Sequence, residues 1–303
     1  MSDFVLETRQ LGKVFGSKHA LRDFNLQIER GGVHALIGSN GAGKSTLFRI
    51  LLGFETPSVG SSFLLGESSQ ALTPACRGKV GYVNDEHTLP RWLTPKQVKA
   101  MQQSYYPLWN EEVYRNVIAS FDVDPNQKVG SLSRGERAGF NLAMALAQSP
   151  ELLILDEPTL GLDVVARQEF LDAVLFCTEI DTTVIYCSHQ MEEVERLAEQ
   201  LIIIEKGVLK EHCTPEDFSA RVQLWIAPLE FRELIRAKIP NLLSSRAIEG
   251  DVHFYVLDPG ESFGSRLGLL GIRDAVSQPL GLANAVRAYL AKNHLGAQQA
   301  LAC

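Results

Sequence analysis

One stretch of the chain constrains its fold and chemistry more than any other. It consists of Gly38, Ser39, Asn40, Gly41, Ala42, Gly43, Lys44, Ser45 and Thr46. This stretch fits the pattern G-x-x-x-x-G-K-[ST], in which a glycine-rich loop joins a strand to a helix. The apolar run 33–37 predicts a buried strand before the loop, and the apolar spacing of 47–52 predicts a helix after it. Such a loop points backbone N–H groups at an anion, and the helix dipole adds to the attraction.

Two side chains of this phosphate loop, residues 38–46, have expected roles of their own. Lys44 can reach the terminal phosphates of a nucleotide, and Ser45 can ligate Mg²⁺. The alternative is a glycine turn that ends in Lys-Ser by coincidence, and the flanking strand and helix argue against it. The loop therefore predicts that the chain binds a nucleoside triphosphate.

Composition limits the other classes to which the chain could belong. With 303 residues and 45% hydrophobic content, it can form one large domain or two smaller ones. A net charge of −7 argues against a general nucleic-acid binder. No apolar run approaches the roughly 18 residues of a membrane span, and no secretory signal is visible. The five scattered cysteines are typical of reduced cytosolic thiols.

The order of predicted elements separates a large domain, residues 1–213, from a small one, residues 214–303. Alternation through 24–28 predicts antiparallel strands near the N-terminus. Prolines interrupt helical patterns between about 73 and 149, which predicts a mostly helical insertion. Apolar strands at 152–155 and 182–187 flank a helix, as in a parallel sheet.

The smaller domain has a different pattern. Residues 221–226 and 251–257 alternate as half-buried strands, and 229–238 is amphipathic. Leu282, Val286 and Leu290 line one face of a last helix. We expect a small α+β domain that carries no catalytic site.

Two carboxylates follow the predicted strand 152–155. Ligands of parallel sheets bind at the carboxyl ends of the strands, so Asp156 is expected to hold Mg²⁺ through its waters. Glu157 is placed to polarise an attacking water as a general base. A strand that ends in exposed acids is the ordinary alternative, and the upstream phosphate loop argues against it.

The pentapeptide 132–136, Leu-Ser-Arg-Gly-Glu, precedes an amphipathic segment. Ser133 and Gly135 can present a hydroxyl and backbone N–H groups to a phosphate at a helix start, although Ser-x-x-Glu is also an ordinary capping box. The order of phosphate loop, pentapeptide and Asp-Glu strand resembles the ATP-binding cassette (ABC) ATPases. In that family the pentapeptide, called the signature, reads Leu-Ser-Gly-Gly-Gln. The resemblance covers roughly residues 4 to 210.

The resemblance implies a P-loop NTPase core, ATP and Mg²⁺ as cofactors, and three further site residues. Phe15 stands where the family stacks an aromatic ring on adenine, although it could be a core residue. Asp163 lies in a segment like the family's D-loop, whose aspartate contacts a partner subunit. His189 matches the switch histidine that contacts the γ-phosphate, and a structural histidine is the alternative.

The sequence departs from the family pattern at two motifs. Arg134 replaces the first glycine of the signature, and Glu136 replaces its glutamine. The glutamine of the family's Q-loop is absent, because 84–86 reads Asn-Asp-Glu where it would fall. Asp85 is the nearest positional match, and its carboxylate could still reach Mg²⁺.

The resemblance also implies partners. Two copies, identical or not, would meet head to tail, with each ATP between Lys44 and Ser45 of one and Ser133 and Gly135 of the other. The segments 105–110 and 128–133 look most like bacterial exporter subunits, which act with a separate transmembrane permease. The tail is similar to the small C-terminal domain of drug-exporter ATPases. We therefore expect a cytoplasmic protein, peripheral on the inner face of the membrane, without nucleic acid.

Three alternatives remain open at this point. The first is a soluble cassette ATPase that acts on DNA or ribosomes, although such proteins resemble tandem cassettes or carry coiled-coil insertions. The second is an importer ATPase, whose tail is usually longer. The third is an assembly factor with slow turnover, as the unusual Q-loop would allow.

Overall fold

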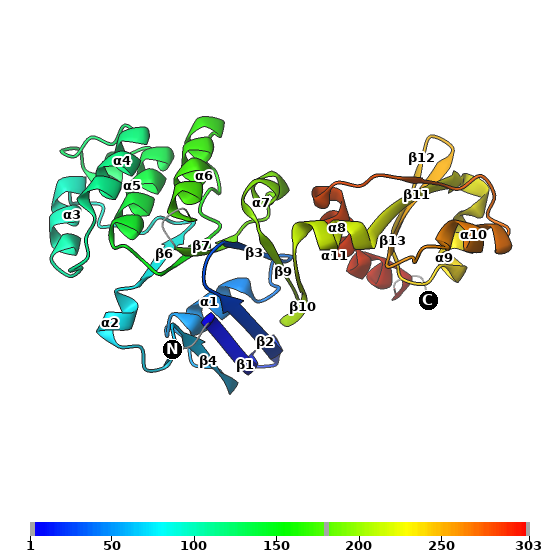
Figure 1. The fold of residues 1–303 in the computed structure, drawn as a ribbon, viewed down its shortest axis with the longest axis horizontal. Helices are drawn as coiled ribbons and strands as arrows, with labels where there is room; N and C mark the ends of the chain where they lie inside the picture. The colour runs from blue at the N-terminus through cyan, green and yellow to red at the C-terminus, as the bar shows by residue number, and fades with distance from the viewer. Residues whose placement is uncertain (1–3, 179–181, 301–303) are drawn as a thin grey trace. The chain divides into compact units, whose positions relative to one another are not determined.

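The computed structural model describes residues 4–178 and 182–300, and they form two compact units, Met1–His212 and Cys213–Cys303 (Figure 1). Among the described residues, no helix has both the length and the apolar character needed to cross a membrane. Cys76, Cys187 and Cys213 carry free thiols, and Cys303 lies outside the described residues.

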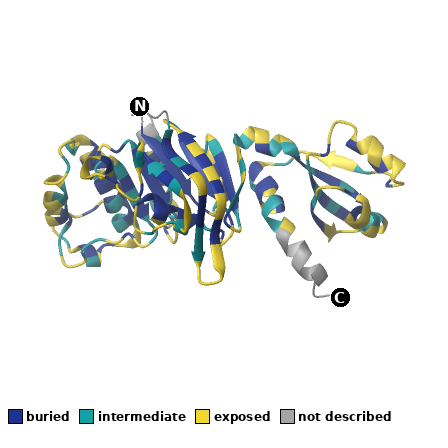
Figure 2. Ribbon diagram, turned by 90° about the horizontal axis from the view of Figure 1, so that it is seen from below, coloured by how far each residue is buried: buried dark blue, intermediate teal, exposed yellow. Residues whose placement is uncertain are grey.

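A six-stranded sheet forms the centre of the first unit. Its strand order is β10-β9-β3-β8-β7-β6. The bounds are β3 Val33–Ile37, β6 Val80–Asn84, β7 Leu152–Asp156, β8 Thr183–Cys187, β9 Gln200–Glu205 and β10 Val208–Cys213. The five strands from β9 to β6 run parallel. Every residue of β3 and β8 is buried, as expected for parallel strands covered on both faces. Buried residues, dark blue in Figure 2, are concentrated on the strands of the first unit.

The predicted antiparallel strands form a second sheet in the order β2-β1-β4-β5. Its strands are β1 Phe4–Phe15, β2 Lys18–Glu29, β4 Val59–Leu64 and β5 Glu67–Ser68. The inward residues Phe24, Leu26 and Ile28 share one core with Leu47 and Phe48 of helix α1, Lys44–Leu51. This core attaches the second sheet to the helix that follows the phosphate loop.

The stretch expected as a mostly helical insertion, about 73–149, is helical only in part. After the short α2, Pro74–Arg77, it contains β6, which pairs with β7 in the central sheet. The expectation was wrong there because β6 is short and its strand character depends on a distant partner. The longer helices are α3 Pro95–Gln103, α4 Glu111–Ser120 and α5 Arg134–Ala147. Helices α6 Val164–Thr178 and α7 Met191–Leu197 follow β7 and β8.

The second unit is an α+β domain built on the antiparallel sheet β12-β13-β11-β14. Its strands are β11 Val222–Pro228, β12 Leu242–Ile248, β13 Asp251–Leu257 and β14 Val276–Gln278. Its helices are α8 Pro215–Arg221, α9 Arg232–Lys238, α10 Phe263–Leu269 and α11 Leu282–Ala300. Trp225, Phe254 and Phe263 belong to a core of this unit. The alternation of β11 and β13 was predicted, whereas β12 and β14 were not.

Glu151 joins two chain segments at the amino-terminal end of the central sheet. Its carboxylate contacts Lys79 Nζ at 2.6 Å and Arg30 NH1 at 2.7 Å. The hydrogen bond from Lys79, and after it the one from Arg30, hold the pKa of Glu151 below its ordinary value of 4.5. The charged form of Glu151 is thus favoured by folding.

The substitution Glu151→Gln should lower the free energy of unfolding at pH 7 by about 0.5–1 kcal/mol, because these ion pairs are partly exposed. A lowered folded pKa gives stability that is present above the unfolded value and is lost as pH falls through the folded value. The difference between the two chains should therefore shrink below about pH 4.5. Urea titrations at pH 7 and at lower pH measure it, and an equal difference at both would contradict this account.

Candidate active site

The phosphate loop spans the gap between the end of β3 at Ile37 and the start of α1 at Lys44. A Cβ atom at Gly38 would lie 2.4 Å from the carbonyl oxygen of Ile204. One at Gly43, where φ is 114°, would lie 2.5 Å from the carbonyl oxygen of Ala20. No other residue fits these two positions without moving the backbone, so the loop keeps its close curl.

Neighbouring segments hold this loop in place. The Ala42 carbonyl accepts a hydrogen bond of 2.7 Å from the backbone N–H of Gly207. Lys206 and Gly207 have φ values of 48° and 80° and form the two-residue turn between β9 and β10. The Gly207 carbonyl in turn accepts from Arg22 N at 2.8 Å. The turn therefore links the phosphate loop to β2.

Lys44 is buried, with 8% of its surface exposed. Its Nζ donates to the Gly38 carbonyl at 2.7 Å, so the ammonium lies against the loop's own backbone. A cavity of about 390 Å³ adjoins the loop, and Phe15, residues 40–46, Asp156 and Glu157 are among the residues that line it. One cavity thus brings together most of the nucleotide-binding residues predicted from sequence.

Phe15 ends β1 and is 46% exposed. The alternative that it is a core residue is therefore wrong. Lys13 Nζ lies 4.8 Å from the centroid of its ring, which is a cation–π distance. A half-exposed ring that lines the cavity can stack on a planar ligand.

Asp156 is the last residue of β7, and it lies in register with Asn84 of β6 and Cys187 of β8. Burial raises the pKa of its carboxyl group, while hydrogen bonds from Ser45 and Cys187 act in the opposite direction. A serine hydroxyl beside a carboxylate is the oxygen donor set that Mg²⁺ uses together with substrate phosphates. Ser45 and Asp156 therefore fit such an ion.

Glu157 follows Asp156 with φ 52°, in the left-handed region, and its backbone N–H donates to the Cys187 carbonyl at 2.9 Å. Its carboxylate oxygen Oε2 lies 2.7 Å from His189 Nδ1 and 3.3 Å from the His189 backbone nitrogen. The sequence predicted both residues but not their contact. The structure makes them a pair at the edge of the sheet.

Ser133, Gly135 and Asp163 are not among the residues that line this cavity. Ser133 caps α5, because its Oγ accepts from Glu136 N at 3.1 Å and its N–H donates to the Glu136 carboxylate at 2.6 Å. The capping box considered from sequence is therefore present. Asp163 accepts from Ala166 N at 2.9 Å at the start of α6.

Asp85 also lies outside the phosphate-loop cavity. It lines a separate cavity of about 330 Å³ together with residues of α5. Its charge is nevertheless one of the influences that raise the pKa of Asp156. Asp85 therefore shares a cavity with the start of α5, and its charge also acts on Asp156 of the predicted metal site.

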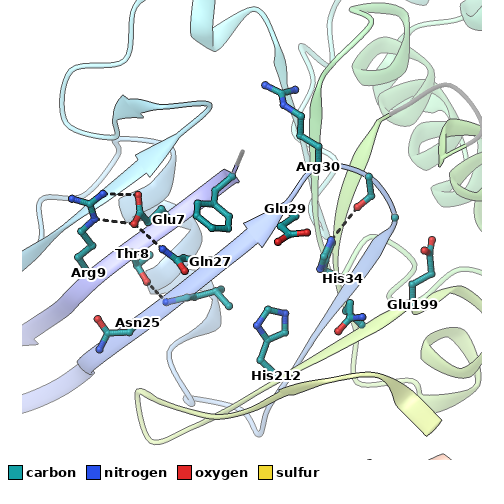
Figure 3. Close-up of a pocket in the computed structure, with 15 residues that line it drawn as sticks. Glu7, Thr8, Arg9, Asn25, Gln27, Glu29, Arg30, His34, Glu199 and His212 are labelled. Carbon is teal, nitrogen blue, oxygen red and sulfur yellow. Dashed lines mark hydrogen bonds and ion pairs between the residues drawn. The ribbon is translucent and has the colours of Figure 1, made fainter. Parts of the chain in front are cut away.

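A larger cavity of about 1040 Å³ contains none of the predicted site residues (Figure 3). It is lined by residues of β1 and β2 and by His34 near the start of β3, at the opposite end of that strand from the phosphate loop. His34 Nε2 lies 3.1 Å from the Gly31 carbonyl, and burial lowers the pKa of this histidine. This cavity therefore lies at the amino-terminal end of β3, whereas the phosphate loop follows its carboxyl end.

Sequence reasoning missed Glu193, a carboxylate that is 2% exposed. It accepts hydrogen bonds from Thr159 Oγ1 at 2.7 Å, Tyr186 Oη at 2.8 Å and Ser188 Oγ at 2.6 Å. Thr159 is two residues after Glu157, and Ser188 directly precedes His189. The hydrogen bonds to Glu193 therefore fix the backbone segments that carry both residues. No local pattern marks it, because its partners come from separate elements.

The substitution Glu193→Ala should lower the free energy of unfolding by about 3 kcal/mol, because three buried hydroxyls lose their acceptor and Arg167 loses its ion-pair partner. Glu193→Gln, which keeps the shape, should cost less. ATP turnover should fall in both, since the Glu157–His189 pair loses its support. Urea titration and a phosphate-release assay measure these effects, with exposed Glu112→Gln as the control. Full turnover in Glu193→Ala would refute the supporting role.

Comparison with known proteins agrees with this geometry. A profile described as "ABC transporter" matches residues 21–160. The chain is 31% identical over 278 residues to the Nod factor export ATP-binding protein I of Cupriavidus pinatubonensis, covering 89% of this chain and 86% of that protein. It is 30% identical over 237 residues to the hypophosphite import ATP-binding protein HtxD of Stutzerimonas stutzeri, covering 72% and 70%.

Solved structures show the same fold. An ATP-binding subunit of an ABC transporter superposes with a TM-score of 0.65 at 25% identity, covering 71% of this chain and 92% of that one. A dimeric ATP-binding cassette bound to ADP and Pi has a TM-score of 0.61 at 22% identity, covering 69% and 98%. The relative that matches along most of both chains identifies this chain as a member of the ABC transporter ATP-binding proteins, whose chemistry is ATP hydrolysis.

Proposed function

We propose that this chain powers export through a separate transmembrane permease. The observation that carries the proposal is the cavity that joins the phosphate loop to Asp156 and Glu157. Two Nod factor export proteins, both from Cupriavidus, match along 89% of this chain, and these long matches favour export. Other export proteins match along 67–68% of it and the import protein along 72%, so the shorter matches do not separate the two directions.

The residues of the cavity have distinct parts in the proposed reaction. Lys44 and the N–H groups of the loop hold the terminal phosphates, and Phe15 stacks on the base. Ser45 and Asp156 would hold Mg²⁺, which when bound neutralises phosphate charge. Asp85 lines a separate cavity, so it is not assigned to the metal here. Water attacks the γ-phosphorus, the bond to the ADP oxygen breaks, and the water proton passes to Glu157. His189, 2.7 Å from Glu157, orients that carboxylate.

A second ATPase subunit, identical or different, would complete the site. Ser133, Gly135 and Asp163 lie outside the chain's own phosphate-loop cavity, and the exposed start of α5 can bind an anion. A head-to-tail pair would place these residues on the nucleotide of the partner. The permease would hold the pair at the inner face of the membrane, and no nucleic acid is involved.

Reconstitution with the permease tests the direction of transport. The membrane protein that co-purifies with this chain is placed in vesicles with the ATPase on the outside. Export predicts that ATP drives cargo into such vesicles, because the side facing the ATPase is the cytoplasmic one. Cargo movement out of the vesicles would favour the importer. An ATP turnover rate that is the same with and without the permease would favour an assembly factor or another soluble role.

The substitution Glu157→Gln should keep ATP binding and reduce hydrolysis by about 100-fold or more, because the water loses its general base. A closed pair of subunits should then accumulate with ATP. Size-exclusion chromatography and phosphate release measure the two effects. Lys44→Ala should instead weaken ATP binding itself, as a fluorescent nucleotide titration would show. An undiminished rate in Glu157→Gln would remove that residue from the reaction.

We also propose that the second unit is regulatory or supports dimerisation. It has its own core, in which Leu224, Phe254 and Val286 are buried. A chain that ends at Cys213 should therefore remain folded and hydrolyse ATP, with weaker self-association or an altered response to the permease. Circular dichroism, light scattering and phosphate release test this. A folded chain of that length that cannot bind ATP would show that the tail belongs to the nucleotide site.

A further inference from the structure

The residues at the two motifs that depart from the family pattern line the same cavity. Arg134 replaces a glycine of the signature, and Asp85 and Glu86 occupy the place of the Q-loop glutamine. These three residues line one cavity of about 330 Å³, together with His87 and Arg137. Residues that are unusual at separate motifs are thus neighbours here.

His87 forms the buried side of this cavity. It is 2% exposed with φ 45°, and its ring nitrogens make no well-formed hydrogen bond among the described residues, although the backbone of Pro158 lies beside the ring. Burial first, and then the charges of Arg134 and Arg137, lower the pKa of His87 to about 4. The ring is therefore neutral at pH 7, and the two acids balance the two arginines.

The two arginines differ in their contacts. Arg137 NH2 donates to the Leu132 carbonyl at 3.3 Å within its own segment. Arg134 is exposed, and its side chain makes no hydrogen bond or ion pair in the described part of the chain. Its guanidinium instead packs on Gly161, in the segment 160–163 that resembles the family's D-loop: a Cβ atom on Gly161, where φ is 74°, would lie 2.8 Å from Arg134 Cζ. Arg134 is thus the more exposed of the two cations beside the acids.

We propose that Arg134 is a positioning residue for ATP hydrolysis and forms one charged unit with Asp85 and Glu86. This inference rests on the proposed function, because Ser133 and Asp163 matter only if they reach the ATP of a partner. Arg134 directly follows Ser133 and touches the D-loop that leads to Asp163. The acids Asp85 and Glu86 directly follow Asn84, which pairs with Asp156 in the sheet. The attraction between Arg134 and these acids therefore links the region of the proposed metal site to the residues that would contact the partner's ATP. A glycine in place of Arg134 could not make this link.

A double-mutant cycle tests the unit. Arg134→Gly restores the family residue, and Asp85→Asn with Glu86→Gln removes both acids without changing their shape. Each change should lower kcat about five- to tenfold and leave KM for ATP within about twofold. The combined variant should be no slower than either, because the same interaction is lost. Arg134→Lys should recover part of the rate, while Arg115→Gln on the exposed face of α4 should change nothing.

Several results would overturn the inference. Rate losses that multiply in the combined variant would mean that Arg134 and the acids act independently. An unchanged kcat in Arg134→Gly would remove the positioning role. A higher Mg²⁺ requirement in Asp85→Asn, whether or not Arg134 is present, would assign Asp85 to the metal instead. Absence of ATP hydrolysis in the unaltered chain with its permease would refute the proposed function rather than this inference.

Discussion

The register of β7 between β6 and β8 determines where the reactive groups of this protein lie. Parallel pairing places Asp156 beside Asn84 and Cys187, so the carboxyl ends of three strands meet at one edge. The chain turns sharply just beyond that edge, at Glu157, whose φ is 52°. A shift of one residue in this pairing would turn Asp156 to the other face of the sheet. The positions of Asp156 and Glu157 therefore depend on backbone hydrogen bonds made inside the sheet.

Glu193 constrains the same region through side-chain hydrogen bonds. The buried Glu193 carboxylate is stabilised by three hydroxyl donors and by Arg167, whose Nε lies 3.6 Å from Oε1. Those donors come from the segment after Glu157, from β8 and from the residue before His189. The network therefore favours a single arrangement of the loop and the strand end that carry Glu157 and His189.

Much of the site could be predicted from sequence, because its motifs are contiguous and each has a local physical reason. Gly43 needs a left-handed backbone, and Asp156 follows a continuous apolar run. Features that depend on distant partners could not be predicted. Strand β6 is short and contains Gly81, and only its pairing with β7 makes it a strand. The neighbours of Glu193 and Arg134 are likewise set by the fold, so neither their burial nor their contacts could be inferred.

The turn at Lys206 and Gly207 has a consequence that extends beyond the loop it supports. Its hydrogen bond to the Ala42 carbonyl lies at one end of β10, and the other end of β10 is Cys213, where the second unit begins. The turn that holds the phosphate loop and the residue at which the second unit begins are therefore the two ends of one six-residue strand. Extended backbone of fixed length, rather than a loop, separates them.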